Sequence, residues 1–240
     1  MPDQHKGWLR QHIEAAVRRG FLEAYETVKV DPAHFLLRLR VAYGLPITSY
    51  QGTFSVSLQQ LDAVALDVIR SGMKMAAAEG AGLGIGGIFT LLPDLGILSA
   101  ITMRTIQKLS LIYGFEFTTE AEIAELWVAA ATAAGADISR ELLEKGVVQR
   151  FVPRVIQAIA VQASKELVEK WAGRLVPVLS GVIGGGINYF FVRAWGERAM
   201  RHFREKHWRL RQQAGPAGET FERSDPQPQL AGSGSRPASD

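Results

Sequence analysis

The chain contains no cysteine, which excludes disulfides, cysteine-ligated zinc sites and thiol catalysis together. It also lacks the apolar–polar alternation that is typical of β-strands. Its net charge is only +3, so it has no global positive field, and we expect no nucleic-acid partner. No apolar run follows the N-terminal residues as in a secretory signal, which favours a cytoplasmic location.

Motifs of known catalytic sites are missing as well. Neither G-x-S-x-G nor H-E-x-x-H occurs, and none of the five histidines has good metal-ligand spacing. His202 and His207, for example, are separated by about 140° around a helix. Gly82, Gly84 and Gly87 match G-x-G-x-x-G, but a predicted helix precedes them where a dinucleotide site needs a strand. We therefore expect a non-enzyme with no catalytic residue, no cofactor and no metal.

Hydrophobic residues make up 47% of the chain, and many of them recur with a helical period. Asp31 before Pro32 predicts a helix start, and Thr119 with Glu122 forms a capping box. Helices are predicted over about 8–28, 32–43, 57–92, 94–113, 119–134, 140–145, 153–171 and 177–212. The sequence thus predicts a single all-α domain over 1–212, and the Pro-, Gly- and Ser-rich tail 213–240 is expected to be disordered.

Glycine is concentrated in two apolar segments, 78–97 and 181–186. Interior glycine costs a helix roughly 0.5–1 kcal/mol relative to alanine, so close packing of helix backbones is the expected compensation. Small residues recur four apart in both segments, as they do where helices approach closely. The candidate packing positions are Gly80, Gly82, Gly84, Gly86, Gly181, Gly184 and Gly185.

These two segments are also candidates for membrane insertion. Residues 80–103 contain one charged residue in 24, and residues 175–192 contain none in 18. However, Pro93 is predicted to break the first run, leaving a helix of only about 20 Å. Asp94 would add a cost of roughly 2.5–3.5 kcal/mol at mid-bilayer. Buried core helices or a membrane-dipping hairpin therefore fit better than two full spans, which remain the alternative.

Polar residues within these apolar helices form a candidate buried or functional set, namely Asp94, Arg104, Asn188 and Arg193. A charge in so apolar a setting needs compensation, which suggests that Asp94 pairs with Arg104 or with Arg193. The simpler alternative is that Asp94 caps the helix after Pro93 while the cations are solvated.

The last predicted helix is amphipathic. Its apolar face carries Val192, Trp195, Ala199, Phe203 and Leu210. The opposite half carries Arg193, Arg198, Arg201, Arg204 and Arg209, together with Trp208. Such a basic helix is a candidate for binding an anionic membrane surface. The alternative is a core-packed helix with a solvated basic face.

Taken in order, several short motifs resemble those of the bacterial EcsC family. They are Ser57-Leu-Gln-Gln-Leu, Glu79-Gly-Ala-Gly-Leu-Gly-Ile-Gly-Gly, Leu92-Pro-Asp, Arg104, Ile112-Tyr-Gly, Gly181-Val-Ile-Gly-Gly-Gly-Ile-Asn and Ala199-Met-Arg-His-Phe. The resemblance covers roughly residues 10–205. It implies a helical protein of ambiguous membrane character, linked by the family name to an ABC-exporter system, and it supplies no catalytic residue.

We therefore expect a non-enzymatic helical protein, peripheral to the cytoplasmic face of the membrane and accessory or regulatory to membrane or transport machinery. Its expected partner is the membrane surface or a membrane protein complex, such as one containing an ABC transporter. The first alternative is a soluble helical module that binds a hydrophobic ligand or a protein. The second is a hydrolase-like enzyme with a buried site at Asp94 and Arg104.

Overall fold

The computed structural model describes residues 2–83, 88–136, 148–172 and 181–214. Within these ranges the chain forms seven α-helices, one short 3-10 helix and no strand, which confirms the all-α prediction. The elements are α1 (Pro2–Thr27), α2 (Pro32–Val41), η1 (Gln51–Ser55), α3 (Leu58–Leu83), α4 (Ile88–Ile112), α5 (Glu120–Ala134), α7 (Val148–Ala172) and α8 (Gly181–Gln213).

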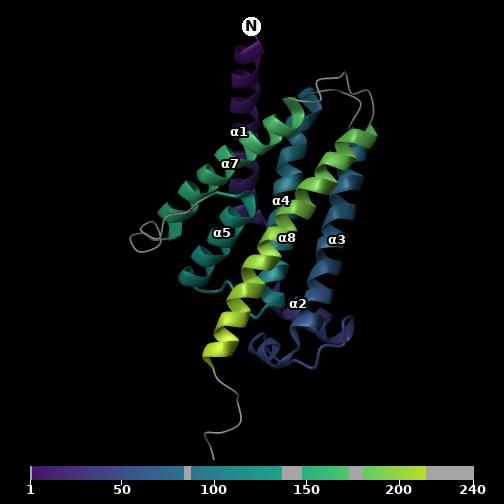
Figure 1. The fold of residues 1–240 in the computed structure, drawn as a ribbon, viewed down its shortest axis with the longest axis vertical. Helices are drawn as coiled ribbons and strands as arrows, with labels where there is room; N and C mark the ends of the chain where they lie inside the picture. The colour runs from purple at the N-terminus through teal and green to yellow at the C-terminus, as the bar shows by residue number, and fades with distance from the viewer. Residues whose placement is uncertain (1, 84–87, 137–147, 173–180, 215–240) are drawn as a thin grey trace, which may run out of the picture.

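The long helices pack as a bundle with α4 and α8 at its centre. Helix α8 packs against α3, α4 and α5, while α1 packs against α4 and α7 (Figure 1). The short helix α2 and the 3-10 helix η1 lie at one end of the bundle, beside the start of α3 (Figure 1). The chain thus closes one end of the bundle with short elements.

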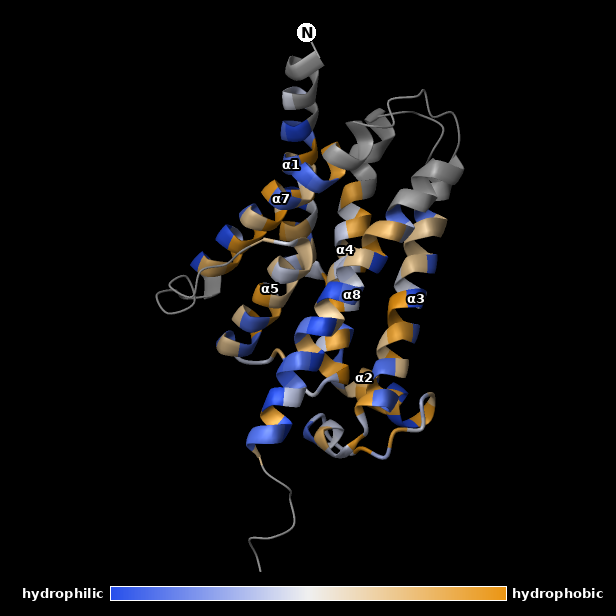
Figure 2. Cartoon of the chain, viewed as in Figure 1, coloured by the Kyte–Doolittle hydropathy of each residue, from blue (hydrophilic) through white to orange (hydrophobic). Residues whose placement is uncertain are grey.

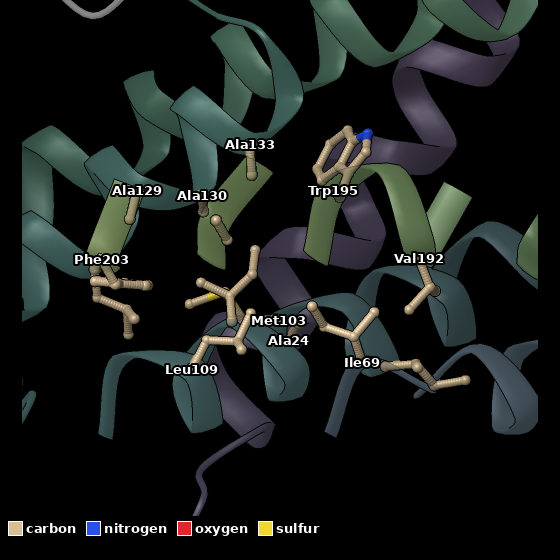
Figure 3. Close-up of a cluster of buried hydrophobic side chains, with 14 of the residues drawn as sticks. Ala24, Ile69, Met103, Leu109, Ala129, Ala130, Ala133, Val192, Trp195 and Phe203 are labelled. Carbon is tan, nitrogen blue, oxygen red and sulfur yellow. The ribbon is translucent and has the colours of Figure 1, made fainter. Parts of the chain in front are cut away.

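The apolar face predicted for the last helix forms the centre of the core. Val192, Trp195 and Phe203 are buried, and they lie among side chains from α3, α4 and α5 (Figure 3). The Trp195 ring stacks on Phe21 of α1, with ring centroids 5.7 Å apart. Leu210, which was assigned to this face, is instead 40% exposed, because it lies beyond the last core contacts near the end of α8.

Glycines do allow close helix contacts, but at positions that the sequence reasoning missed. A Cβ on Gly20 of α1 would lie 2.8 Å from the Cα of Gly96 on α4. A Cβ on Gly72 of α3 would lie 2.7 Å from the Thr105 hydroxyl on α4. Two crossings of α4 therefore depend on the absence of a side chain on the facing helix.

The helix caps predicted at Asp31 and Thr119 and the turn at Gly135 are present in the structure, whereas the break predicted at Pro93 lies earlier, between Leu83 and Ile88. The Asp31 carboxylate accepts hydrogen bonds from the backbone N–H groups of Ala33 and His34 and so caps α2. Thr119 and Glu122 form the expected capping box of α5. Gly135 ends α5 with a φ of 76°, a left-handed conformation that favours glycine.

Two prolines, in contrast, lie inside helices that they were predicted to start or interrupt. Helix α4 runs from Ile88 through Pro93, and α7 runs from Val148 through Pro153. Each proline is the sixth residue of its helix, where it removes one backbone hydrogen bond near the start. Packing of α4 and α7 against neighbouring helices compensates for that loss, so neither proline ends a helix.

Several predictions fall outside the described residues. These are the short helix at 140–145, the start of the last helix at 177–180, Gly84, Gly86 and the tail from 215 onward. The backbones of Gly80, Gly82, Gly181, Gly184 and Gly185 are helical, but their contacts are not described. Their proposed packing role stays a prediction.

Candidate functional site

Four helix ends meet at the end of the bundle opposite α2. Helices α3 and α7 finish there, at Leu83 and Ala172, while α4 and α8 begin there, at Ile88 and Gly181 (Figure 1). We call these four termini the glycine-rich end. Both apolar, glycine-containing segments of the sequence contribute to it.

Exposed apolar side chains lead toward the glycine-rich end. Met75 on α3, Ile97 on α4 and Phe190 on α8 are 43%, 40% and 63% exposed. At 1.5 Å per residue, each lies within about 15 Å of the helix terminus at this end. Large apolar side chains are exposed elsewhere too, among them Val41 on α2 and Trp208 on α8, so these three mark the region only as one candidate contact surface.

Helix α4 also contains a segment, Leu95–Ile112, that is long and apolar enough to cross a membrane by length and composition. However, 72% of this segment is buried within the protein. The core helix of a soluble protein has the same properties, so the segment gives only weak evidence of a membrane span.

The candidate polar residues of the apolar helices do not form one buried site among the described side chains. Arg104 is exposed, which corrects its assignment as a buried residue. Arg193 is also exposed, and its Nε donates to Glu197 at 2.8 Å on the same helix. Asn188 is buried, as expected. The Asp94 side chain lies outside the described set, so its pairing stays a prediction.

The arginines of α8 are largely engaged within the protein. Arg198 forms an ion pair with Glu166 of α7 at 3.2 Å, and Arg204 forms one with Asp62 of α3 at 2.9 Å. Arg201 and Arg209 have no ion pair among the described residues. The polar residues of α8 extend along its lower half, away from the glycine-rich end (Figure 2).

The sequence predicted two candidate membrane-binding elements, the glycine-rich apolar segments and the basic face of α8. In the structure these two elements lie far apart along α8. Arg209 lies 19 residues after Phe190, or roughly 28 Å along the helix axis. One flat surface across the glycine-rich end therefore does not reach the lower arginines. The arrangement favours the alternative reading of α8 as a core helix with a basic outer face.

The opposite end of the bundle contains a polar network that sequence reasoning missed. The Tyr113 hydroxyl donates to Asp62 at 2.7 Å, and Asp62 also accepts from Arg204. His207 is buried, with Nδ1 2.9 Å from the Tyr113 carbonyl oxygen and its ring stacked on Phe54 at 4.3 Å. We call this set the polar end. No motif indicated it, because its members lie far apart in the sequence.

The polar end shifts the pKa values of two of its groups. Burial and the bond to Asp62 raise the pKa of Tyr113 well above its usual value, so this hydroxyl stays protonated. Burial lowers the pKa of His207, and the Arg211 charge lowers it further. A neutral His207 that donates from Nδ1 has Nε2 as a bare acceptor, and Nε2 has no partner among the described atoms. These groups stabilise the fold, and they do not include a nucleophile with an adjacent base.

In the part of the chain that the structure describes, no group of three or more histidine, cysteine, aspartate or glutamate side chains is placed to hold a metal ion. The described residues thus define a class, an all-α bundle with a polar network at one end and glycine-containing helix termini at the other.

Comparison with known proteins identifies the family. A model of the EcsC protein family matches residues 1–207, which is most of the chain. The chain is also 28% identical over 197 residues to the protein EcsC of Bacillus subtilis (strain 168), covering 80% of this chain and 83% of that protein. No solved structure matches. The chain belongs to the EcsC family.

Proposed function

We propose that this EcsC family protein binds the cytoplasmic face of the membrane through its glycine-rich end. The observation that carries the proposal is that α4 and α8 both begin at this end of the bundle, and that both begin within the apolar, glycine-containing segments of the sequence. In this position the protein assists or regulates membrane or transport machinery without catalysing a reaction. The ABC-exporter association implied by the family resemblance supports that role.

The energetics favour a shallow contact. Fully burying a large apolar side chain contributes about 1.5–3 kcal/mol, and Met75, Ile97 and Phe190 are only partly exposed. Scaled by these exposed fractions, their combined contribution is roughly 2–4 kcal/mol, which is less than that of a single lipid anchor that itself binds membranes only marginally and reversibly. The expected binding is therefore peripheral and reversible.

A full membrane span is less favourable than this contact. Most of Leu95–Ile112 is buried against other helices, and exposing it to lipid would require the bundle to open. Arg104 also lies in the middle of that segment. Deeper insertion of the hairpin remains an outcome that the experiment below distinguishes.

The proposal is tested with vesicles that contain anionic lipid, mixed with the full chain and separated by flotation. We expect binding that falls strongly in the Phe190→Asp and Ile97→Asp variants, because each places a charge at the contact surface. The matched control is Trp208→Asp, since Trp208 is 47% exposed near the far end of α8. Its binding should equal that of the wild type.

Washing the vesicles separates the possible modes. Binding that survives high salt but not carbonate supports peripheral contact of the apolar end, whereas resistance to carbonate supports hairpin insertion. Release by salt alone would assign binding to the basic face of α8 and would contradict the proposal. A protein that floats under none of these conditions is the soluble module described above.

A further inference from the structure

The first turns of α1 extend outward at the glycine-rich end. Figure 1 shows the N-terminal end of α1 at the same end of the molecule as the starts of α4 and α8, and farther out than either. The helix begins at Pro2, but Ile13 is the first of its described side chains that is buried. We call residues 2–12 the projecting segment.

The contact between α1 and α4 shows how far this segment extends. A Cβ on Gly20 of α1 would lie 2.8 Å from the Cα of Gly96 on α4, so the two helices are level at these glycines. Both helices run away from the glycine-rich end (Figure 1). At 1.5 Å per residue, Ile88 lies about 12 Å before this level on α4, and Trp8 lies about 18 Å before it on α1. Trp8 is therefore about 6 Å beyond the start of α4 along the helix axes.

Trp8 is the large aromatic side chain of this segment. It is 46% exposed, and its ring packs on His12 of the same helix with centroids 4.1 Å apart. Single exposed apolar residues are common on proteins, so exposure alone says little about Trp8. Its position is more informative, because Trp8 lies farther out than Met75, Ile97 and Phe190, which lead toward the same end.

The residues around Trp8 suit one layer of a membrane. Lys6 and Arg10 stand two residues on either side of it. Tryptophan is enriched at the level of the lipid headgroups, where its ring meets apolar groups and its N–H meets water. Charged side chains are costly in the hydrocarbon core, but Lys and Arg are attracted to anionic headgroups. The segment therefore fits the headgroup layer and not the hydrocarbon below it.

We propose that the projecting segment lies in the lipid headgroup layer when the glycine-rich end contacts a membrane, with Trp8 as its anchor. This inference rests on the proposed function and specifies the lipid layer that the protein contacts. The headgroup layer is about 5–8 Å deep on each side of a bilayer, which matches the position of Trp8 beyond α4. Lys6 is farther out than Trp8 and would enter hydrocarbon before α4 could, so it limits the contact to a shallow one.

The first test locates the segment with one fluorescent label, because the chain has no cysteine of its own. Gly7→Cys keeps Trp8, and nothing lies within 4 Å of a Cβ at this position. An NBD label there should emit more strongly and at shorter wavelength when phosphatidylcholine–phosphatidylglycerol vesicles are added to the full chain. Quencher lipids that carry the spin label near the headgroup should quench it more than those that carry it deep in the acyl chain. The matched control is a label on the exposed Gln212→Cys at the far end of α8, which should not respond.

The second test measures how much Trp8 contributes. In vesicle flotation, Trp8→Ala should bind about three- to tenfold more weakly, because about half of a large side chain loses its contact. Trp8→Tyr should restore most of the binding, since tyrosine also favours the headgroup level. Both variants should keep the wild-type Tm, because Trp8 is exposed and lies before the first described buried residue of α1.

The outcomes separate this inference from the proposed function. If the wild type floats while the label at position 7 does not respond and Trp8→Ala binds equally well, the inference is wrong and the proposed function stands. If the wild type does not float at all, both are wrong. Stronger quenching by the deep quencher would place the segment in hydrocarbon and overturn the inference. A change in emission that needs no vesicles and grows with protein concentration would assign the segment to a second copy of the chain, and would overturn it as well.

Discussion

The two ends of the bundle are built in opposite ways. At the polar end, side chains from α3, α4 and α8 meet in one network around Asp62, Tyr113 and His207. At the glycine-rich end, the same three helices carry Met75, Ile97 and Phe190 on their exposed sides. These helices thus share a hydrogen-bonded network at one end and carry three exposed apolar side chains toward the other, although Trp208 and Leu210 of α8 are also exposed near the polar end.

This difference indicates how stability and binding are divided along the molecule. Directional contacts at the polar end hold the helices in register and tie down the connection between α2 and α3. For example, Arg211 of α8 donates to the Val56 carbonyl oxygen at 3.0 Å. Apolar side chains exposed at the glycine-rich end contribute little to folding, and in the proposed function they contact the membrane. We therefore expect substitutions at the polar end to affect stability and those at the other end to affect binding.

Among substitutions at the polar end, the largest effect is expected at Gly114, which follows the end of α4 and has a φ of 87°. A Cβ there would lie 2.5 Å from the Thr53 hydroxyl oxygen and 3.1 Å from the Tyr50 carbonyl oxygen. Gly114→Ala combines left-handed strain with overpacking and should cost about 2–4 kcal/mol. Urea denaturation followed by circular dichroism measures the loss.

Gly135→Ala is the matched control for the backbone strain alone. Gly135 has a similar φ of 76°, but its nearest neighbour would be 3.7 Å from a new Cβ. We expect a cost of about 1–2 kcal/mol. Equal losses for the two variants would show that the contacts of η1 with Gly114 do not stabilise the polar end.

A smaller loss is expected when the polar network loses its acceptor. Asp62→Ala leaves the buried Tyr113 hydroxyl without a partner and should cost about 1–3 kcal/mol. The Arg204 pair adds little to this, because both side chains are partly exposed. Asp67→Ala removes an acceptor from the more exposed Tyr43 and should cost less than about 1 kcal/mol. If the two variants are equally stable, the network is not a stabilising feature.

The sequence predicts the helices well because their signals are local. Asp31, Thr119 and Gly135 act within a few residues, and the apolar period of α8 identifies Val192, Trp195 and Phe203 as core residues. Proline was the exception. The rule that proline starts or breaks a helix describes an isolated helix, whereas tertiary packing holds Pro93 and Pro153 inside α4 and α7.

The sites were harder to predict because they depend on tertiary contacts. Asp62 and Arg204 are 142 residues apart, and no spacing rule connects them. The arginine pattern of α8 suggested a membrane surface, yet the acids that pair with Arg198 and Arg204 lie on other helices. Likewise, Gly20 faces Gly96, and although Gly96 lies in the glycine-rich segment 78–97, neither glycine was among the packing positions named from the sequence.

A smaller and gradual loss of stability is expected when the pH is lowered, because of a histidine at the polar end. The pKa of His207 is lowered from 6.5 by burial and by Arg211, while the Tyr113 carbonyl oxygen and Asp62 oppose the shift. The unfolded chain therefore binds the proton first, and the free energy of unfolding should fall as pH drops below 6.5. Urea midpoints between pH 7 and 5 measure the slope.

The histidine responsible is identified by substitution. His207→Gln should flatten the slope while retaining a side chain that can donate to the Tyr113 carbonyl oxygen. His202 also has a pKa lowered mainly by burial, so His202→Gln measures its separate share. An unchanged slope in His207→Gln would show that the polar end does not sense pH in this range.

The smallest effect on stability is expected for Phe190→Ala, toward the glycine-rich end. The neighbouring Phe191 allows a direct comparison. Phe190 is 63% exposed, so Phe190→Ala should change the free energy of unfolding by less than about 0.5 kcal/mol. Phe191 is buried and stacks on Trp195 with ring centroids 4.5 Å apart, so Phe191→Ala should cost about 3–5 kcal/mol. The order of the losses in vesicle binding should be the reverse of the order of the losses in stability. In flotation, Phe190→Ala should lose more binding than the fraction of Phe191→Ala that remains folded. If Phe190→Ala instead destabilises the protein in solution, its ring belongs to the core and the division between the two ends fails at this residue.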